Sequence, residues 1–223
     1  MPTFVYLMCA AEARVGKTLL SRLYLDYLAS TFDSALGFDT NIRDPVLAST
    51  FPDLTKIVDF GSSRGPVTLF DSLIRPDGVP KVVDLWYISH EAFFSQARQL
   101  GFFEEAKRNS IAVVILLFPD LRVGHIDEIT EYYALVSVQN NWLRRQASQS
   151  RYAIVLPTLD RELVQMLARP NVLTYQVLHS ESALSSTYPF DRRNSLAQFF
   201  LQVEDLEVRI ALEHSCSSEH RLK

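Results

Sequence analysis

Residues 4–20 read FVYLMCAAEARVGKTLL, and this stretch decides the predicted fold. It opens with an apolar, β-prone run at residues 4–8, which predicts a buried strand. A loop over residues 10–16 follows, and leucines and tyrosines then recur at helical spacing from 17 to 30. The stretch therefore predicts a strand, a loop and an amphipathic helix in direct succession.

The same alternation continues along the chain. The clearest strand is residues 111–118, an unbroken apolar run typical of a strand covered on both faces of its sheet. Further strands are predicted at 34–38, 56–60, 81–86, 152–156 and 172–177. Helices are predicted at 67–74, 90–103, 126–138, 160–168 and 196–210, and residues 41–53 are expected to form a loop. Alternating strands and helices predict an α/β fold, with a mostly parallel central sheet flanked by helices.

Composition excludes several classes of protein. The chain has 223 residues and a net charge of −4, so it lacks the strongly basic character of many nucleic-acid-binding proteins. Two cysteines are too few for a disulfide framework or a zinc knuckle. The longest apolar run is far shorter than a membrane span, and no secretory signal opens the chain, which predicts a cytoplasmic protein without a transmembrane segment. We expect a single domain over 1–213 and a polar C-terminal tail at 214–223.

A phosphate-binding motif lies between the first strand and the first helix. Residues 11–18 read AEARVGKT, which follows the pattern G-x-x-x-x-G-K-[ST] except that Ala11 replaces the first glycine. Backbone N–H groups at such a helix start point at phosphate oxygens. Lys17 would reach the terminal phosphates, and the Thr18 hydroxyl would bind Mg²⁺. The predicted nucleotide-binding residues are Ala11, Glu12, Ala13, Arg14, Val15, Gly16, Lys17, Thr18 and Leu19.

Two acidic residues end neighbouring predicted strands. Asp84 follows an apolar strand, where a Walker-B carboxylate would bind Mg²⁺ beside the phosphates. Asp39 ends the second strand, and the carboxyl ends of parallel strands share one edge of a sheet. We therefore predict a metal site of Thr18, Asp39 and Asp84. Asp39 would orient the attacking water or, alternatively, cap the loop that follows it.

These motifs resemble those of the ParA/MinD-like P-loop ATPases, which carry a deviant Walker A motif. Residues 12–18 correspond to the family's K-G-G-V-G-K-T. Asp39 corresponds to the second acid of the family's D-x-D, and Asp84 corresponds to its Walker-B acid. Trp86 replaces the small turn that follows the Walker-B acid in the family. The resemblance implies a three-layer P-loop NTPase fold, ATP and Mg²⁺ as ligands, an ATP-dependent homodimer and a protein partner. It also suggests the small plasmid-borne branch, which acts in plasmid partition, stability or conjugal transfer.

The chain departs from this family at its signature lysine, whose position is Glu12. Arg14 is a candidate substitute cation because a guanidinium suits phosphate, and it joins Lys17 and Asp39 as a predicted catalytic residue. The alternative is an exposed Arg14–Glu12 ion pair that contributes little. We expect an ATP-binding switch with slow or partner-dependent hydrolysis.

Two other functions fit the sequence less well. A degenerate, non-catalytic P-loop scaffold is favoured by Glu12, the missing glycines and Trp86. A dethiobiotin synthetase-like ligase would need a lysine in the loop after the second strand, and residues 39–43 contain none. DNA association would depend on the short basic clusters at 144–145 and 192–193, which are more typical of solvated faces in an acidic chain.

Overall fold

The computed structural model describes most of the chain. The described residues are 3–10, 12–32, 34–118, 134–137, 152–156, 174–179 and 190–219, together with Arg161, Gln165, Leu167 and Pro170. Within this described part, no helix combines the length and the apolar character needed to cross a membrane.

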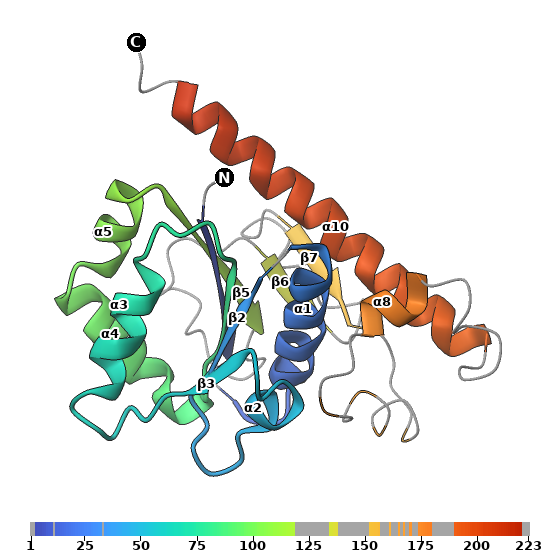
Figure 1. Ribbon diagram of the computed structural model, residues 1–223, viewed down its shortest axis with the longest axis horizontal. Coiled ribbons are helices and arrows are strands. Elements are labelled where there is room, and N and C mark those ends of the chain that lie inside the picture. Colours follow the sequence, from blue (N-terminus) through green and yellow to red (C-terminus); the bar gives the residue numbers. More distant parts are fainter. Residues whose placement is uncertain are drawn as a thin grey trace.

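In the part of the chain that the structure describes, the centre is one seven-stranded sheet in the order β3-β2-β4-β1-β5-β6-β7 (Figure 1). Every neighbouring pair of strands is parallel. The strands are β1 (Thr3–Ala10), β2 (Leu36–Asp39), β3 (Thr55–Ile57), β4 (Lys81–Asp84), β5 (Ile111–Phe118), β6 (Ala134–Ser137) and β7 (Tyr152–Val155). The parallel sheet predicted from the alternation of elements is confirmed.

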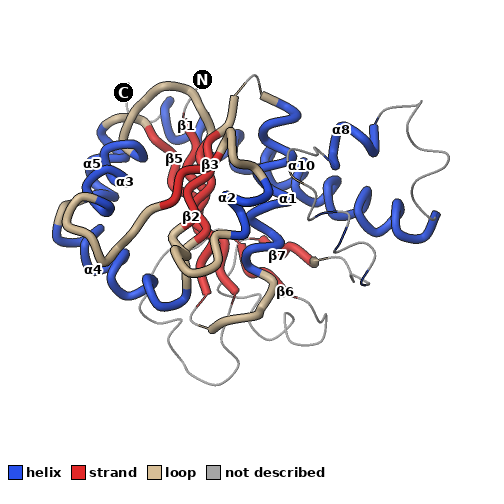
Figure 2. Tube along the Cα trace, turned by 60° about the horizontal axis from the view of Figure 1, so that its bottom comes forward, coloured by secondary structure: helices blue, strands red, loops and turns tan. Residues whose placement is uncertain are grey.

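Helices cover both faces of the sheet (Figure 2). One face carries α3 (Gly65–Leu73), α4 (His90–Gln99) and α5 (Phe102–Arg108). The other face carries α1 (Lys17–Thr31), α2 (Val46–Thr50), α8 (Thr174–His179) and α10 (Phe190–Glu219). A short 3₁₀ helix, η1 (Tyr87–Ser89), comes directly before α4. The fold is therefore α/β with helices on either side of a parallel sheet.

Strand β1 shows why both faces need cover. Tyr6 and Met8 belong to the core beneath α1 and α10, whereas Val5 and Leu7 belong to the core beneath α3, α4 and α5. All four side chains are fully buried. Successive side chains of a strand point to opposite faces, so a strand this apolar needs a helix layer on each side.

Helix α10 is connected to the first strand by hydrogen bonds to the half-buried Glu207. Glu207 of α10 accepts hydrogen bonds from the hydroxyls of Tyr6 and Tyr24. Burial raises the pKa of Glu207, although the two tyrosine donors act in the opposite direction. A buried carboxyl needs such donors, because an unpaired polar group in the core is costly.

Several predicted elements differ from the structure. Residues 134–137 form strand β6, although a helix was predicted over 126–138, and residues 174–179 form helix α8 in place of a predicted strand. The rest of the 126–138 prediction lies outside the described residues. Both errors arose because short apolar runs do not distinguish helix from strand.

Three smaller differences concern helix limits. The predicted loop 41–53 contains α2, and the predicted helix 90–103 ends at Gln99, where Gly101 adopts φ 64° before α5 begins. The terminal helix continues to Glu219, so the start of the predicted polar tail is helical. Of the helix predicted at 160–168, Arg161, Gln165 and Leu167 are described, and they are helical.

The start of α3 yields a stability prediction. A Cβ atom on Gly65 would lie 2.0 Å from the backbone carbonyl oxygen of Asp59, so any side chain there forces the two backbone segments apart. We expect Gly65→Ala to lower the free energy of unfolding by about 1–3 kcal/mol in urea denaturation. Ser63→Ala, at an exposed position in the same turn, should change it by less than about 0.5 kcal/mol. Equal stability of the two variants would contradict the packing argument.

Candidate functional site

The loop that precedes α1 has the backbone of a tight, left-handed turn. Gly16 caps the helix with φ 93°, and Arg14 also adopts a positive φ of 62°. A side chain at Gly16 would be strained by this positive φ, and its Cβ would lie 3.0 Å from Cδ1 of Leu156, which would have to shift slightly. Its carbonyl accepts the first helical bond, from Leu20 N at 3.0 Å. The predicted contribution of Ala11 lies outside the described residues.

Sheet register brings the two acids to the same edge. Asp84 is the last residue of β4, where it lies opposite Met8 of β1 and opposite Asp39 of β2. Residues opposite each other in a parallel sheet project to the same face, and Met8 belongs to the α1 side. Both carboxylates therefore point toward α1, at the end of the sheet where the 12–16 loop leaves β1.

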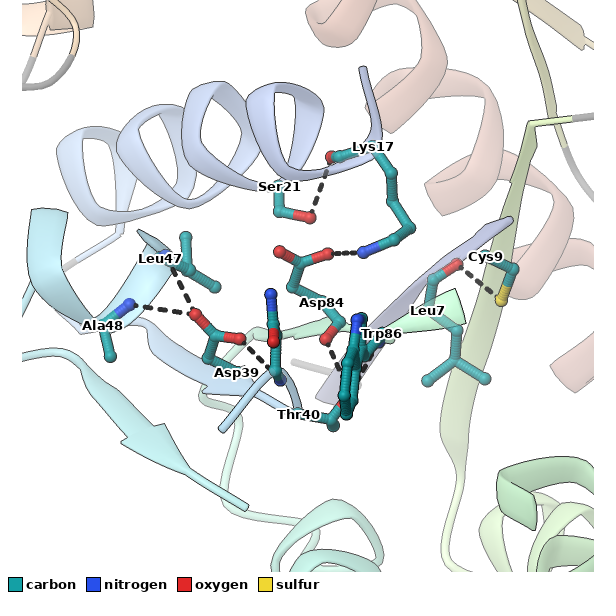
Figure 3. A network of polar contacts seen from close by, with 11 residues as sticks. Leu7, Cys9, Lys17, Ser21, Asp39, Thr40, Leu47, Ala48, Asp84 and Trp86 are labelled. Carbon is teal, nitrogen blue, oxygen red and sulfur yellow. Dashed lines mark hydrogen bonds and ion pairs between the residues drawn. The ribbon is translucent and has the colours of Figure 1, made fainter. Parts of the chain in front are cut away.

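Lys17 and Asp84 form a buried ion pair. The ammonium of Lys17 both donates a hydrogen bond to Oδ1 of Asp84 and pairs with its charge. Lys17 is 9% exposed and Asp84 2%. Figure 3 shows the Asp84 carboxylate between Lys17 and Asp39. Two opposite charges withdrawn from water need one another, because either alone would bear the full desolvation cost.

The carboxylate of Asp39 is occupied by backbone donors. Its Oδ1 accepts the N–H of Asn41 at 3.0 Å, and its Oδ2 accepts those of Leu47 and Ala48 at 2.9 and 3.3 Å. These contacts are the capping alternative: Asp39 holds the following loop and the start of α2. Burial raises the pKa of Asp39 to about 6; the Asn41 donor opposes that rise, and the charge of Asp84 adds to it.

Thr40 joins the loops that follow β2 and β4. Its hydroxyl donates to the carbonyl oxygen of Asp84 at 3.1 Å and accepts the backbone N–H of Trp86 at 2.7 Å. Its own N–H donates to the same Asp84 oxygen at 3.2 Å. On the outside, the guanidinium of Arg43 stacks over the Trp86 ring, 5.6 Å from its centroid. Hydrogen bonds of Thr40 therefore join the two loops.

The remaining predicted residues lie in the same turn or in the first turn of α1. Ala13 and Arg14 are exposed; Glu12, Val15, Thr18 and Leu19 are half-buried. Within the described residues, no ion pair joins Arg14 to Glu12. Nor does that part of the chain contain a cluster of three His, Cys, Asp or Glu side chains able to hold a metal ion without further ligands.

Sequence reasoning missed the role of Thr40 and the stacking of Arg43 on Trp86. Thr40 follows a strand-end acid, a position that by itself carries no distinctive signal. The pairing of Arg43 with Trp86 joins residues from separate loops, and no spacing pattern in a single sequence reveals such a contact. The sequence did predict that Lys17, Asp39 and Asp84 lie near one another, because Asp39 and Asp84 each end a strand and Lys17 begins the helix that follows the first strand; their roles stay a prediction.

Comparison with known proteins adds no relative. No family model matches the chain, and a search of curated proteins gives no match.

The buried ion pair gives a prediction about stability. We expect Lys17→Met and Asp84→Asn each to lower the free energy of unfolding by about 3–5 kcal/mol, because each leaves a buried group without its partner. The double variant should lose clearly less than the sum of the two, as a double-mutant cycle in urea measures. Strict additivity would show that the two groups do not interact.

The pKa of Asp39 predicts how stability depends on pH. An unfolded aspartate titrates near 3.8, whereas Asp39 in the folded protein titrates near 6. The free energy of unfolding that the Asp39 carboxyl contributes is fully present below about pH 4. It is lost as the pH rises through about 6, a change on the order of 2–3 kcal/mol. Urea denaturation across this range should show a smaller decline in Asp39→Asn than in the unsubstituted protein. If the stability of both proteins fell equally with pH, the raised pKa could not belong to Asp39.

Proposed function

We propose that the protein is an ATP-binding switch of the ParA/MinD-like type, with slow or partner-dependent hydrolysis. One observation carries the proposal: the ammonium of Lys17, at the start of α1, meets the carboxylate of Asp84 at the end of the adjacent strand β4. A helix N-terminus, a lysine and a strand-end acid are the groups that hold a nucleotide's terminal phosphates and its divalent ion.

The backbone of the turn supports the same proposal. In the resembling motif K-G-G-V-G-K-T, glycines stand at the positions of Arg14 and Gly16, and both residues here adopt positive φ. The chain thus keeps a glycine-type conformation even where it has lost the glycine. Arg14 is exposed on this turn, so its guanidinium is available as the cation that Glu12 does not supply.

The side chains present fit a magnesium ion accompanied by phosphate. Mg²⁺ is usually held by one or two carboxylates, a hydroxyl, phosphate oxygens and water. Thr18 and Asp84 would hold it, with Asp39 close behind. When bound, the ion neutralises charge on the phosphates. Binding requires Lys17 to leave Asp84 for a phosphate oxygen, which exchanges one buried charge pair for another.

The contacts of Asp39 support slow turnover. Both of its carboxylate oxygens already accept backbone N–H groups, so the carboxylate that would orient a water molecule is engaged in holding the 40–48 segment. A partner that shifts this segment would release Asp39. We propose that such a protein partner controls hydrolysis, in a cytoplasmic setting such as plasmid partition, stability or conjugal transfer.

A non-catalytic scaffold is the second candidate. The observation in its favour is the Lys17–Asp84 pair itself, which satisfies both charges without a ligand. In a scaffold this pair would be a permanent part of the core. The two functions differ in whether a triphosphate displaces it.

Thermal unfolding with ATP and Mg²⁺ tests the proposal. A ligand that binds only the native state raises the melting temperature, and at a hundred times its Kd it adds about 3 kcal/mol. We expect a rise with ATP and Mg²⁺ and none in Lys17→Ala. Thr18→Val should reduce the magnesium-dependent part of the shift, because it removes the hydroxyl and keeps the shape.

Two further variants complete this experiment. Thr68→Val, at an exposed threonine of α3, is the matched control and should respond as the unsubstituted protein does. Arg14→Gly keeps the positive φ without strain and should diminish the shift if the guanidinium binds phosphate. No rise in the unsubstituted protein at millimolar ATP, or an equal rise in Lys17→Ala, would favour the scaffold.

A further inference from the structure

The backbone that carries the Asp84 carboxylate is held from two sides where it leaves the sheet. The carbonyl oxygen of Asp84 accepts two hydrogen bonds from Thr40, one from its N–H at 3.2 Å and one from its hydroxyl at 3.1 Å. The next N–H, that of Leu85, donates to the carbonyl oxygen of Met8 at 3.3 Å. The peptide group that follows Asp84 is therefore held by the residue after β2 on one side and by β1 on the other.

The hydroxyl of Thr40 extends this hold to the next peptide group. It accepts the backbone N–H of Trp86 at 2.7 Å while it donates to the carbonyl oxygen of Asp84. A hydroxyl is both donor and acceptor, so one side chain holds two peptide groups of the same segment. Figure 3 shows Thr40 beneath Asp84 and beside Trp86.

Thr40 is itself well fixed. It is 1% exposed, and Asp39, directly before it, accepts the N–H of Asn41, directly after it, at 3.0 Å. The same loop also reaches the Trp86 ring, over which the guanidinium of Arg43 stacks. The loop after β2 therefore holds Trp86 through a backbone hydrogen bond and through its side chain.

We propose that Thr40 is a positioning residue of the candidate site, whose hydroxyl holds residues 84–86 so that the Asp84 carboxylate faces Lys17. An aspartate side chain has only two rotatable bonds, so the direction of its Cα–Cβ bond decides what its carboxylate reaches. A group that binds a ligand must be held to within about 0.5 Å by the residues around it. At the end of a strand the ladder of hydrogen bonds stops, and the Thr40 hydroxyl supplies the missing constraint.

This role can be measured without a nucleotide. The use of Asp84 for Mg²⁺ rests on the proposed function, whereas the ion pair of Asp84 with Lys17 is present in the protein alone. The experiment below therefore uses no ATP. A failure of ATP to bind would count against the proposed function, and a failure of this experiment would count against the role of Thr40.

A double-mutant cycle repeated in a Thr40→Val background tests the proposal. The cycle compares urea unfolding of proteins that carry Lys17→Met, Asp84→Asn, both or neither, so its coupling reports the interaction between the two groups. Valine keeps the shape of threonine and removes the hydroxyl. We expect the coupling, expressed as a ratio of unfolding equilibrium constants, to fall at least about fivefold. A loss of stability alone is no support, because removal of any buried hydroxyl has that effect.

Matched variants separate the hydroxyl from other effects. Thr40→Ser retains the hydroxyl and should keep the coupling within about twofold. Thr50→Val is the control: Thr50 is 3% exposed, and its hydroxyl donates to the carbonyl oxygen of Val46 at 2.8 Å, within α2. It should leave the coupling unchanged, because its hydroxyl does not contact Asp84. Thr40→Ala removes the same hydroxyl and replaces Thr40→Val if that variant does not fold.

Hydrogen exchange measures the second contact of the hydroxyl. The N–H of Trp86 should exchange slowly in the unsubstituted protein and in Thr40→Ser, and at least about tenfold faster in Thr40→Val or Thr40→Ala. An unchanged coupling in the hydroxyl-free variants would show that Thr40 joins two loops without positioning Asp84. An equal fall of the coupling in Thr40→Ser or Thr50→Val, or rapid exchange of the Trp86 N–H before any substitution, would also overturn the proposal.

Discussion

The ion pair between Lys17 and Asp84 is the interaction on which the candidate site depends. It connects the first turn of α1 to the end of β4, and these elements are 67 residues apart in the chain. Two charges this deeply buried are stable only as a pair, so they fix the height at which α1 packs on the sheet. Under the proposed function, the same requirement would make the pair responsive to a ligand that offers each charge a new partner.

The parallel sheet explains why these groups meet at all. Strands β1, β4 and β2 are adjacent and point the same way, so every residue that ends one of them reaches the same edge. Thr40 then connects two of the loops that leave this edge, and Asp39 holds the start of α2. A triphosphate that reached Asp84 would therefore act on a connected set of loops, which is what a switch protein requires.

The sequence predicted the elements that are covered on both sides. β5 was found at its observed limits, since an unbroken apolar run between polar residues has few alternatives. The errors fell on short elements. A strand was predicted at 172–177, yet residues 174–179 form α8, whose first N–H groups donate to the buried Asp26 of α1 at 2.6 and 3.1 Å. That contact spans most of the chain and leaves no local pattern. Lys17 and Asp84 were predictable because a motif and a strand end fix their positions, whereas the bridging role of Thr40 depends on two loops meeting.

The hydrogen bond from Tyr6 to Glu207 connects residues 201 positions apart. One side of β1 is therefore covered only once α10, far along the chain, has been synthesised. Such long-range contacts slow folding, because the chain must close a large loop before the contact contributes stability. During translation the nascent chain would hold an uncovered tyrosine-bearing surface until α10 has left the ribosome. A chain shortened before Glu207 would keep that surface exposed and be prone to aggregate, with the loops around Lys17 and Asp84 intact in sequence but without a completed core beneath them.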